Sequence, residues 1–217
     1  ATVHHNKRSV EKLATTFGIH DKNLVKELTE LAIVRRARAI ATSPEDNKDK
    51  FQEIVELYHS QVNLSHRTSQ SVLLQQYSTP APIGFLAGIF VRADKGVSIF
   101  EPSAGNGLLT IAGIEQNIVV NEIDSVRNAN LHTQGFKAVL KQDATKPFSE
   151  FRNKFDAVIT NPPFGTLDSE VMYDTFPIKT LDHLMALRAL DTMKDNGKAA
   201  IIIGGHTQWD EKGRIQS

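Results

Sequence analysis

The sequence contains no cysteine, no hydrophobic run long enough to cross a bilayer, and no excess of charge of either sign. Without cysteine, disulfide bonds, thiolate metal ligands and thiol nucleophiles are excluded, and we expect no metal site. A transmembrane helix needs about 20 apolar residues, and residues 1–7 lack the apolar core of a signal peptide. Lysine plus arginine and aspartate plus glutamate both total 25, so a nucleic-acid contact must rely on a local patch. We therefore expect a cytoplasmic protein that does not associate with a membrane.

The 217 residues suffice for one large domain, or for one domain with a small helical region beside it. Apolar residues recur at helical spacing through the first third of the chain. We predict an N-terminal helical region over residues 1–70 and a main domain over residues 71–217. The helices expected in the first region cover residues 9–18, 21–41 and 49–62.

The first two of these helices loosely resemble a helix-turn-helix, and the second carries Arg35, Arg36 and Arg38. One interpretation is that this helix contacts DNA. The alternative is a small helical bundle that packs beside the main domain. Residues 1–70 hold 11 basic and 9 acidic side chains, and this near balance favours the bundle.

After residue 71, short apolar runs alternate with helical stretches. Such an alternation predicts a doubly wound, mainly parallel sheet of the Rossmann-like α/β class. We expect strands over residues 97–101, 118–122, 137–141, 155–160 and 198–203. We expect helices over residues 83–91, from about residue 108, and over residues 181–194.

A glycine turn, Pro102-Ser103-Ala104-Gly105-Asn106-Gly107, follows the first predicted strand, which ends at Glu101. A strand, a glycine turn and a helix form the usual layout of nucleotide-type cofactor sites. Gly105 and Gly107 allow the backbone to approach a ligand closely. The dinucleotide fingerprint has a third glycine that is missing here, which argues against NAD. A glycine turn of this kind can also be purely structural.

Acidic residues follow the next two predicted strands. Glu122 lies 21 residues after Glu101, the distance at which an acid at the next strand end can accept ribose hydroxyls. Asp143 could accept a hydrogen bond from an adenine amino group, or it could cap its own loop. Upstream, the hydroxyls of Ser78 and Thr79 and the first N–H groups of the helix after Pro80 could bind a carboxylate, although any capped helix has a similar pattern.

The fourth predicted strand ends at Asn161-Pro162-Pro163-Phe164. Proline has no N–H for the sheet and fixes its own φ, so the strand stops in a stiff elbow. In an open α/β sheet, ligands bind at this carboxyl edge of the strands. The elbow carries an amide side chain and a flat aromatic ring, and these groups predict a site for a planar amino compound.

Together these motifs resemble the S-adenosylmethionine-dependent adenine-N6 DNA methyltransferases of the gamma arrangement. Residues 101–107 are similar to the cofactor loop of that family, and residues 161–164, beginning 60 positions after Glu101, to its catalytic (D/N)PP(Y/F) motif. Residues 77–80 are similar to the segment that helps to hold the methionine part of the cofactor. The chain also resembles methylase modules of helicase-linked mobile-element proteins. The resemblance covers roughly residues 72–205.

The resemblance implies S-adenosylmethionine as methyl donor, S-adenosylhomocysteine as product and DNA as substrate. It implies catalytic roles for Asn161, Pro162 and Phe164. The Asn161 side-chain oxygen and the Pro162 carbonyl would accept hydrogen bonds from the amine, and Phe164 would stack on a flipped base. Substrate contacts are implied for Pro163, Phe164 and His183, although His183 could equally be an exposed residue at a helix start. The implied cofactor contacts are Tyr77, Ser78, Thr79, Pro80, Glu101, Pro102, Ser103, Ala104, Gly105, Gly107, Glu122, Ile123, Asp143, Ala144 and Asn161.

The resemblance also implies further strands and a target-recognition region after the fifth strand, whereas this sequence stops at Ser217. We therefore expect a C-terminally incomplete core that works within a larger polypeptide, in restriction–modification or a related setting, and methylates DNA weakly alone. Two alternatives stay open. The acceptor could be an RNA adenine or a protein glutamine amide, or the chain could be a silent cofactor-binding or partner-binding module.

Overall fold

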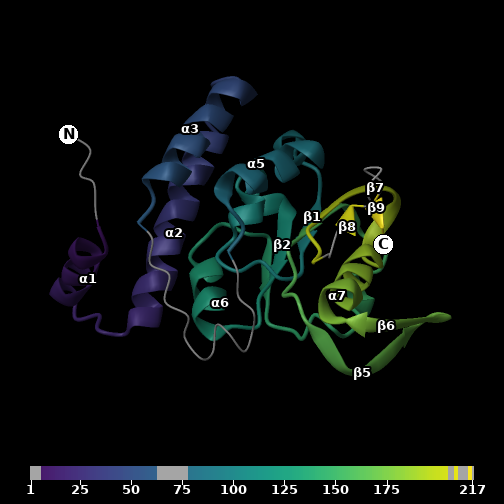
Figure 1. Cartoon of the computed structure of the whole chain (residues 1–217). Helices are drawn as coiled ribbons and strands as arrows, with labels where there is room; N and C mark the ends of the chain where they lie inside the picture. Colours follow the sequence, from purple (N-terminus) through teal and green to yellow (C-terminus); the bar gives the residue numbers. More distant parts are fainter. Residues whose placement is uncertain (1–5, 63–77, 205–207, 210–214, 217) are drawn as a thin grey trace.

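The computed structural model describes residues 6–62, 78–204, 208–209 and 215–216. A five-stranded, fully parallel sheet has the order β3-β2-β1-β4-β7 (Figure 1). The strand order reverses between β1 and β4, which is the topological switch point of a doubly wound fold. The predicted α/β class is therefore confirmed. The strands are β1 (Ile99–Glu101), β2 (Ile118–Asn121), β3 (Ala138–Leu140), β4 (Phe155–Thr160) and β7 (Met193–Ile201).

Helices cover both faces of the sheet. Successive strand residues point to opposite faces, so each strand contributes side chains to two cores. Ile99 and Ile159 pack into one core with the helices α2, α3, α5 and α6. Phe100 and Val158 pack into a second core with α7 (Figure 1). Burial on both faces explains why the strands read as continuous apolar runs. The helices are α1 (Lys7–Thr16), α2 (Lys22–Ala41), α3 (Asn47–Ser60), α5 (Ala81–Phe90), α6 (Ser125–His132) and α7 (Leu181–Leu190).

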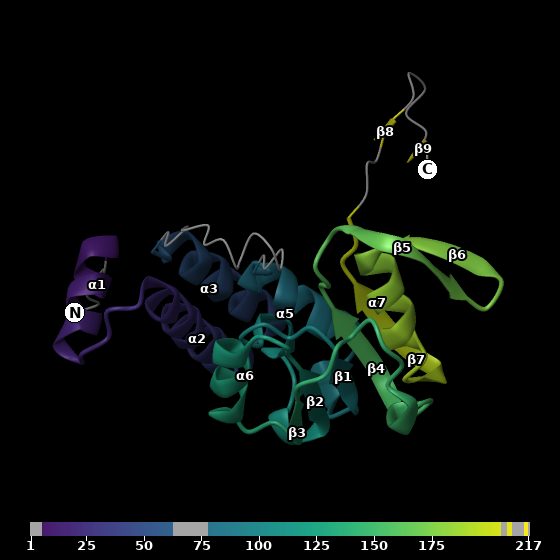
Figure 2. The same ribbon diagram turned by 90° about the horizontal axis from the view of Figure 1, so that it is seen from below.

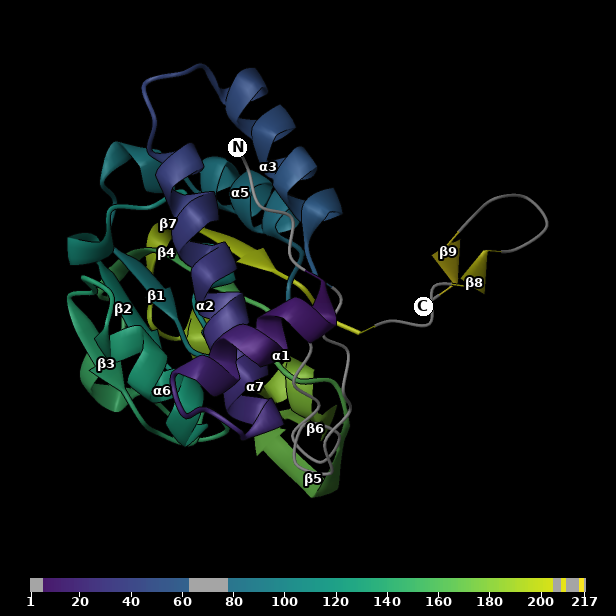
Figure 3. The ribbon, with the colours of Figure 1, turned by 90° about the vertical axis from the view of Figure 1, so that its left-hand side faces the viewer.

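The N-terminal helices begin at side-chain caps. Asn6, Asp21 and Asp46 each accept a hydrogen bond from a backbone N–H of the first turn. The third helix starts and ends two residues earlier than expected, because Asp46 is its cap. Helix α1 lies against α2 (Figure 3), while α2 and α3 contribute side chains to the core that covers the sheet. The division at residue 70 stays a prediction.

The three arginines of α2 bind other parts of the chain. Arg35 donates to Thr133, and Arg36 pairs with Glu53. Arg38 donates to the Thr110 carbonyl and hydroxyl at 2.9 and 2.8 Å, and its side chain is mostly buried. These bonds agree with the packed-bundle interpretation of this helix.

The expected helix after the glycine turn is wrong, because a 3₁₀ turn, η2 (Leu108–Thr110), follows Gly107 and no α-helix lies between Gly107 and β2. Ten residues separate Gly107 from Ile118, too few for a full helix and its connections. Helix α5 packs there instead, and Gly84 lies directly against the backbone of Leu108. The other 3₁₀ turns are η1 (Ala93–Lys95), η3 (Glu115–Asn117) and η4 (Ser149–Phe151).

The expected helix over residues 181–194 ends at Leu190, so its last part is also wrong. The Thr192 carbonyl accepts hydrogen bonds from the N–H groups of Lys154 and Phe155, which draws the chain into the sheet. Strand β7 therefore starts at Met193, five residues earlier than expected. The extra residues form an irregularity in its pairing with β4.

An antiparallel hairpin between the elbow and α7 was not predicted. It consists of β5 (Thr166–Tyr173) and β6 (Phe176–Thr180), and it projects beyond α7 in Figure 2. The Tyr173 hydroxyl donates to Asp191 at 2.5 Å and ties the hairpin to the end of α7. A short pair, β8 (Gln208–Trp209) and β9 (Ile215–Gln216), lies near the end of the chain. No helix among the described residues is long and apolar enough to cross a membrane.

Candidate functional site

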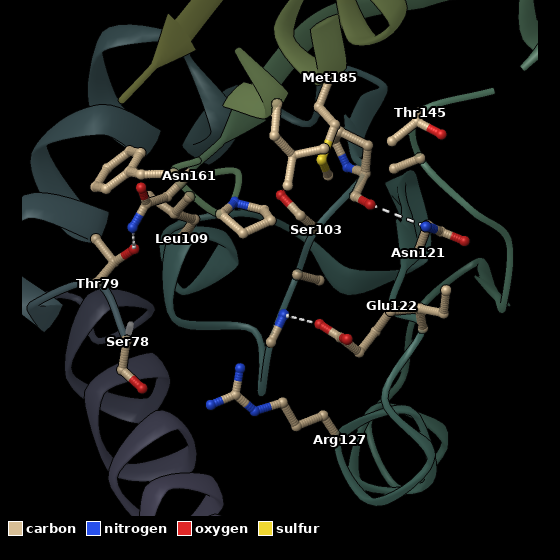
Figure 4. Close-up of a pocket in the computed structure, with 18 of the residues that line it drawn as sticks. Ser78, Thr79, Ser103, Leu109, Asn121, Glu122, Arg127, Thr145, Asn161 and Met185 are labelled. Atoms are coloured by element: carbon tan, nitrogen blue, oxygen red, sulfur yellow. Dashed lines mark hydrogen bonds between the residues drawn. The ribbon is translucent and has the colours of Figure 1, made fainter. Parts of the chain in front are cut away.

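A cavity of about 400 Å³ opens at the carboxyl edge of the sheet, beside the switch point between β1 and β4 (Figure 4). Its walls come from the loops after β1, β2, β3 and β4, and from α2 and α7. The structure brings most of the predicted site residues to this cavity. The predicted residues that line it are Ser78, Thr79, Pro102, Ser103, Ala104, Gly105, Glu122, Ile123, Asp143, Ala144, Asn161, Pro163 and Phe164.

Other predicted residues do not line the cavity. Pro80 and Gly107 are chain neighbours of the lining residues Thr79 and Leu108 but do not line the cavity themselves, and Pro162 is buried. His183 is exposed on α7 outside the cavity. Tyr77 lies outside the described residues.

Glu101, also a predicted cofactor contact, lies beneath the cavity and is fully buried. One carboxyl oxygen accepts a weak hydrogen bond from the Ser103 N–H at 3.4 Å, and the other has no partner in the described part of the chain. Burial raises the pKa of Glu101 well above its usual range. Folding therefore favours the protonated form of Glu101 beneath the glycine turn.

Glu122 is bound to the glycine turn. The Gly105 N–H donates to Glu122 Oε2 at 2.8 Å (Figure 4), and the Asp124 N–H donates to Glu122 Oε1 at 2.8 Å. Gly105 has a φ of 56°, a conformation that a side chain would strain. Burial raises the pKa of Glu122 despite these donors. The carboxylate is thus held in one orientation, with lone pairs left for a ligand.

Sequence reasoning missed Asn121, the residue before Glu122. Its Nδ2 donates to the carbonyls of Pro102 and Gln142 at 2.9 and 3.0 Å, and its Oδ1 accepts from the Gln142 N–H at 2.7 Å. These bonds join the loops that follow three adjacent strands. A polar residue at the end of an otherwise apolar strand was the signal that could have identified it.

Asp143 lies at the cavity wall in the loop after β3. Its Oδ1 accepts from the Thr145 N–H and hydroxyl at 2.9 and 2.7 Å. The predicted loop cap is therefore present. Oδ2 takes no part in these two bonds, so a cap does not exclude a ligand contact.

At the elbow, the Asn161 side chain has a defined orientation. Its Nδ2 donates to the Thr79 hydroxyl at 2.9 Å (Figure 4). Its Oδ1 is buried and has no hydrogen-bond partner in the described part of the chain. Buried polar atoms in native structures nearly always have partners, so an unpaired acceptor beside a cavity indicates a place for a donor from a ligand.

The Phe164 ring forms another part of the wall, to which Leu181 and Met185 of α7 also contribute. Behind the ring, a Cβ on Gly204 would lie 3.4 Å from two of its carbons. The Gly204 N–H donates to the buried carboxylate of Asp182 at 2.9 Å. These contacts hold the ring in position from its far side. Nothing local in the sequence marks Gly204 or Asp182.

A charged cluster on α2 and α6 was also missed. Arg127 Nε donates to Glu27 Oε2 at 2.8 Å, and both side chains are almost fully buried. Asn106 of the glycine turn donates to the same Glu27 oxygen at 2.7 Å. Burial alone would lower the pKa of Arg127, but Glu27 and Glu30 raise it above its usual value. Arg127 and Glu30 both line the cavity.

Similarity to known proteins is consistent with this geometry. A family model described as N-6 DNA Methylase matches residues 86–213. The Type II methyltransferase M.AccI of Acinetobacter calcoaceticus is 25% identical over 167 residues, which are 67% of this chain and 30% of M.AccI. The chain thus spans less than a third of the length of that relative.

Two solved structures are similar at low scores. One is a Pyrococcus horikoshii protein proposed to be an RNA methyltransferase, with 21% identity and a TM-score of 0.46, covering 71% of this chain and 72% of that chain. The other is TrmN of Thermus thermophilus, with 19% identity and a TM-score of 0.35, covering 47% and 33% of the two chains. At these TM-scores neither structure indicates which molecule receives the methyl group from this chain.

Proposed function

The chain belongs to the N-6 DNA methylase family, and we propose that it transfers a methyl group from S-adenosylmethionine to the N6 amine of adenine in DNA. Membership of the family makes the chain a methyltransferase and S-adenosylmethionine its methyl donor, with S-adenosylhomocysteine as the product. The adenine acceptor, and DNA as its carrier, are part of the proposal. The observation that carries it is the buried Asn161 Oδ1 beside the cavity, which has no hydrogen-bond partner in the part of the chain that the structure describes.

The residues around the cavity fit this donor. Glu122 has both oxygens oriented by backbone N–H groups and keeps lone pairs that can accept ribose hydroxyls. Ile123 is 55% exposed and offers an apolar surface next to Glu122 for the adenine ring, and Ala144 and Asp143 line the same cavity. The cavity volume of about 400 Å³ lies within the range of small-molecule sites. When bound, the cofactor supplies a methyl group on a positively charged sulfur.

Two oxygen atoms of the elbow are proposed to accept hydrogen bonds from the amine that receives the methyl group. An aromatic amine is a poor nucleophile, because its lone pair is delocalised into the ring. Asn161 Oδ1 would accept one N–H of the amine. The Pro162 carbonyl is the second proposed acceptor, although Pro162 itself is buried and does not line the cavity. These bonds draw the nitrogen toward tetrahedral geometry and localise its lone pair. An oxygen that is already fixed in place does not have to reorganise during the reaction. Much of the remaining rate enhancement comes from holding the amine in line with the methyl group.

Phe164 would hold the ring that carries the amine. An adenine inside a duplex cannot reach the cavity, so the nucleotide must be flipped out. An aromatic side chain stacks on any base and contributes about 1–3 kcal/mol. Phe164 is half-buried and backed by Gly204, which gives it the fixed orientation that stacking requires.

Recognition of the duplex is proposed to involve other protein segments. The net charge of the chain is zero, and Arg35, Arg36 and Arg38 are engaged within it. Affinity for DNA depends largely on basic groups that are free to meet phosphates. We therefore propose that the chain acts within a larger polypeptide, with residues 71–217 as the methyltransferase core.

The experiment that tests the proposal compares three acceptors in parallel. Labelled S-adenosylmethionine is incubated with the protein and with duplex DNA, RNA of the same sequence, or protein. We expect label in the DNA, recovered as N6-methyladenine after digestion to nucleosides. A duplex of G·C pairs alone is the control and should stay unlabelled. Label found only in RNA, only in protein, or on cytosine would contradict the proposal.

A further inference from the structure

We propose that Glu30 and Arg127 form a subsite for the amino-acid end of the cofactor, with Glu30 binding the α-ammonium and Arg127 the α-carboxylate. The inference rests on the proposed function, because it requires S-adenosylmethionine in the cavity. It also gives the N-terminal helix α2 a direct part in the site.

The two side chains reach the same cavity from different parts of the fold. Glu30 lies on α2 and Arg127 on α6, and both line the cavity together with Ser78 and Gly105. Figure 4 shows Arg127 close to the hydrogen-bonded Glu122, and it shows both Arg127 and Ser78 on the side of the cavity away from Met185. An ammonium and a carboxylate on one carbon need one acidic and one basic group close together, and this pair provides them.

Arg127 is held rigidly by α2. Its Nε and Nη2 donate to the two carboxylate oxygens of Glu27 at 2.8 and 3.4 Å. Its Nη1 lies near the glycine turn, 3.9 Å from the position that a Cβ on Gly105 would take. A guanidinium has five N–H donors in a fixed plane, so one edge can bind Glu27 while other donors face the cavity.

Glu30 lies one helical turn after Glu27 on the same side of α2. Its Oε2 accepts a hydrogen bond from the Ser78 hydroxyl. The side chain is half-buried, so it can exchange water for a ligand without a large penalty. A carboxylate with one hydroxyl donor retains lone pairs on both oxygens, and an ammonium brings three N–H donors to fill them.

The test uses two ligands that differ only at the amino-acid end. S-adenosylhomocysteine carries the ammonium and carboxylate, whereas 5′-methylthioadenosine has the same adenosine and sulfur without them. Both are titrated into the wild-type chain and into Glu30→Gln by calorimetry. We expect Glu30→Gln to weaken S-adenosylhomocysteine binding about 10-fold to 100-fold, as for other hydrogen bonds to charged groups. Binding of 5′-methylthioadenosine should change by less than about twofold.

The matched control is Glu56→Gln, which removes an exposed carboxylate from α3 outside the cavity and should leave both affinities unchanged. A second variant, Arg127→Lys, should show the same selective loss while retaining a positive charge beside Glu27. Equal losses for both ligands in Glu30→Gln would show a purely structural role and overturn the inference, as would no loss for either. If the wild-type chain binds neither ligand, the proposed function itself fails.

Discussion

The side-chain nitrogen of Asn161 donates a hydrogen bond to the Thr79 hydroxyl at 2.9 Å, although the two residues lie 82 positions apart. Thr79 immediately precedes Pro80 at the start of α5, and Asn161 directly follows β4. The bond joins the segment predicted to hold the cofactor to the elbow predicted to hold the acceptor. It also turns Asn161 Oδ1 away from Thr79. This oxygen has no hydrogen-bond partner among the described residues, and it is the proposed acceptor for the substrate amine.

Thr79→Val should slow methyl transfer about 10-fold, because the variant keeps the shape of threonine but removes the partner of Asn161 Nδ2. The loss corresponds to about 1.4 kcal/mol, within the range of about 0.5–1.5 kcal/mol that a neutral hydrogen bond usually contributes. Single-turnover transfer rates measure the effect. Thr79→Ser retains the hydroxyl and should restore most of the rate. A valine variant as fast as the serine variant would show that Thr79 does not position the amide.

Glu101→Gln should change the pH dependence of stability. Burial raises the pKa of Glu101 in the folded state above its ordinary value of 4.5, so folding favours the protonated form. That contribution to stability is complete below the unfolded pKa and is lost as pH rises through the folded pKa. The variant is neutral at every pH. Its advantage in free energy of unfolding over the wild type should therefore grow with increasing pH.

Urea unfolding at several values from about pH 5 to about pH 9 measures this difference. Glu56→Gln, at an exposed position of α3, is the control and should show no such trend. A difference for Glu101→Gln that stays constant across the range would mean that Glu101 titrates alike in the folded and unfolded states.

Gly84→Ala should destabilise the protein, although alanine is favoured over glycine inside a helix by about 1 kcal/mol. A Cβ at Gly84 would collide with the Leu108 carbonyl oxygen and lie 3.1 Å from the carbonyl carbon. Because these are backbone atoms, relief requires a shift of α5 away from the glycine turn. We expect a loss of about 1–3 kcal/mol in the free energy of unfolding. Leu86→Ala, on the exposed side of the same helix, should change it by less than about 0.5 kcal/mol. An unchanged or increased stability in Gly84→Ala would contradict the packing described.

The features that the sequence predicted well have local causes. Strand β4 matches its predicted bounds, because the apolar run indicates a buried strand and the two prolines after it fix where the strand ends. The glycine turn was also identified, but the helix expected after it was not there, because its place is taken by α5 from an earlier part of the chain. The hairpin of residues 166–180 has an exposed, mixed pattern with Pro177 inside it, which hides its pairing.

The contacts that were missed at the site join distant parts of the chain, even where both residues, such as Asn161 and Thr79, were predicted individually. Arg127 reaches Glu27 across 100 positions, and Asn161 reaches Thr79 across 82. Neither spacing has a periodicity that a sequence reveals. Glu30 looks like one more polar residue of α2, and only the packing of α2 against α6 shows that it lines the cavity.

The most direct test of the central claim is to compare cofactor binding and methyl transfer in Asn161→Ala. If the elbow activates the amine, the variant should bind S-adenosylmethionine within about threefold of the wild type. It should transfer the methyl group at least about 100-fold more slowly, as when a single preorganised polar group is removed from other active sites. Gln52→Ala, which removes an exposed amide from α3, is the control and should leave both quantities unchanged. A transfer rate in Asn161→Ala equal to that of the wild type would contradict the account.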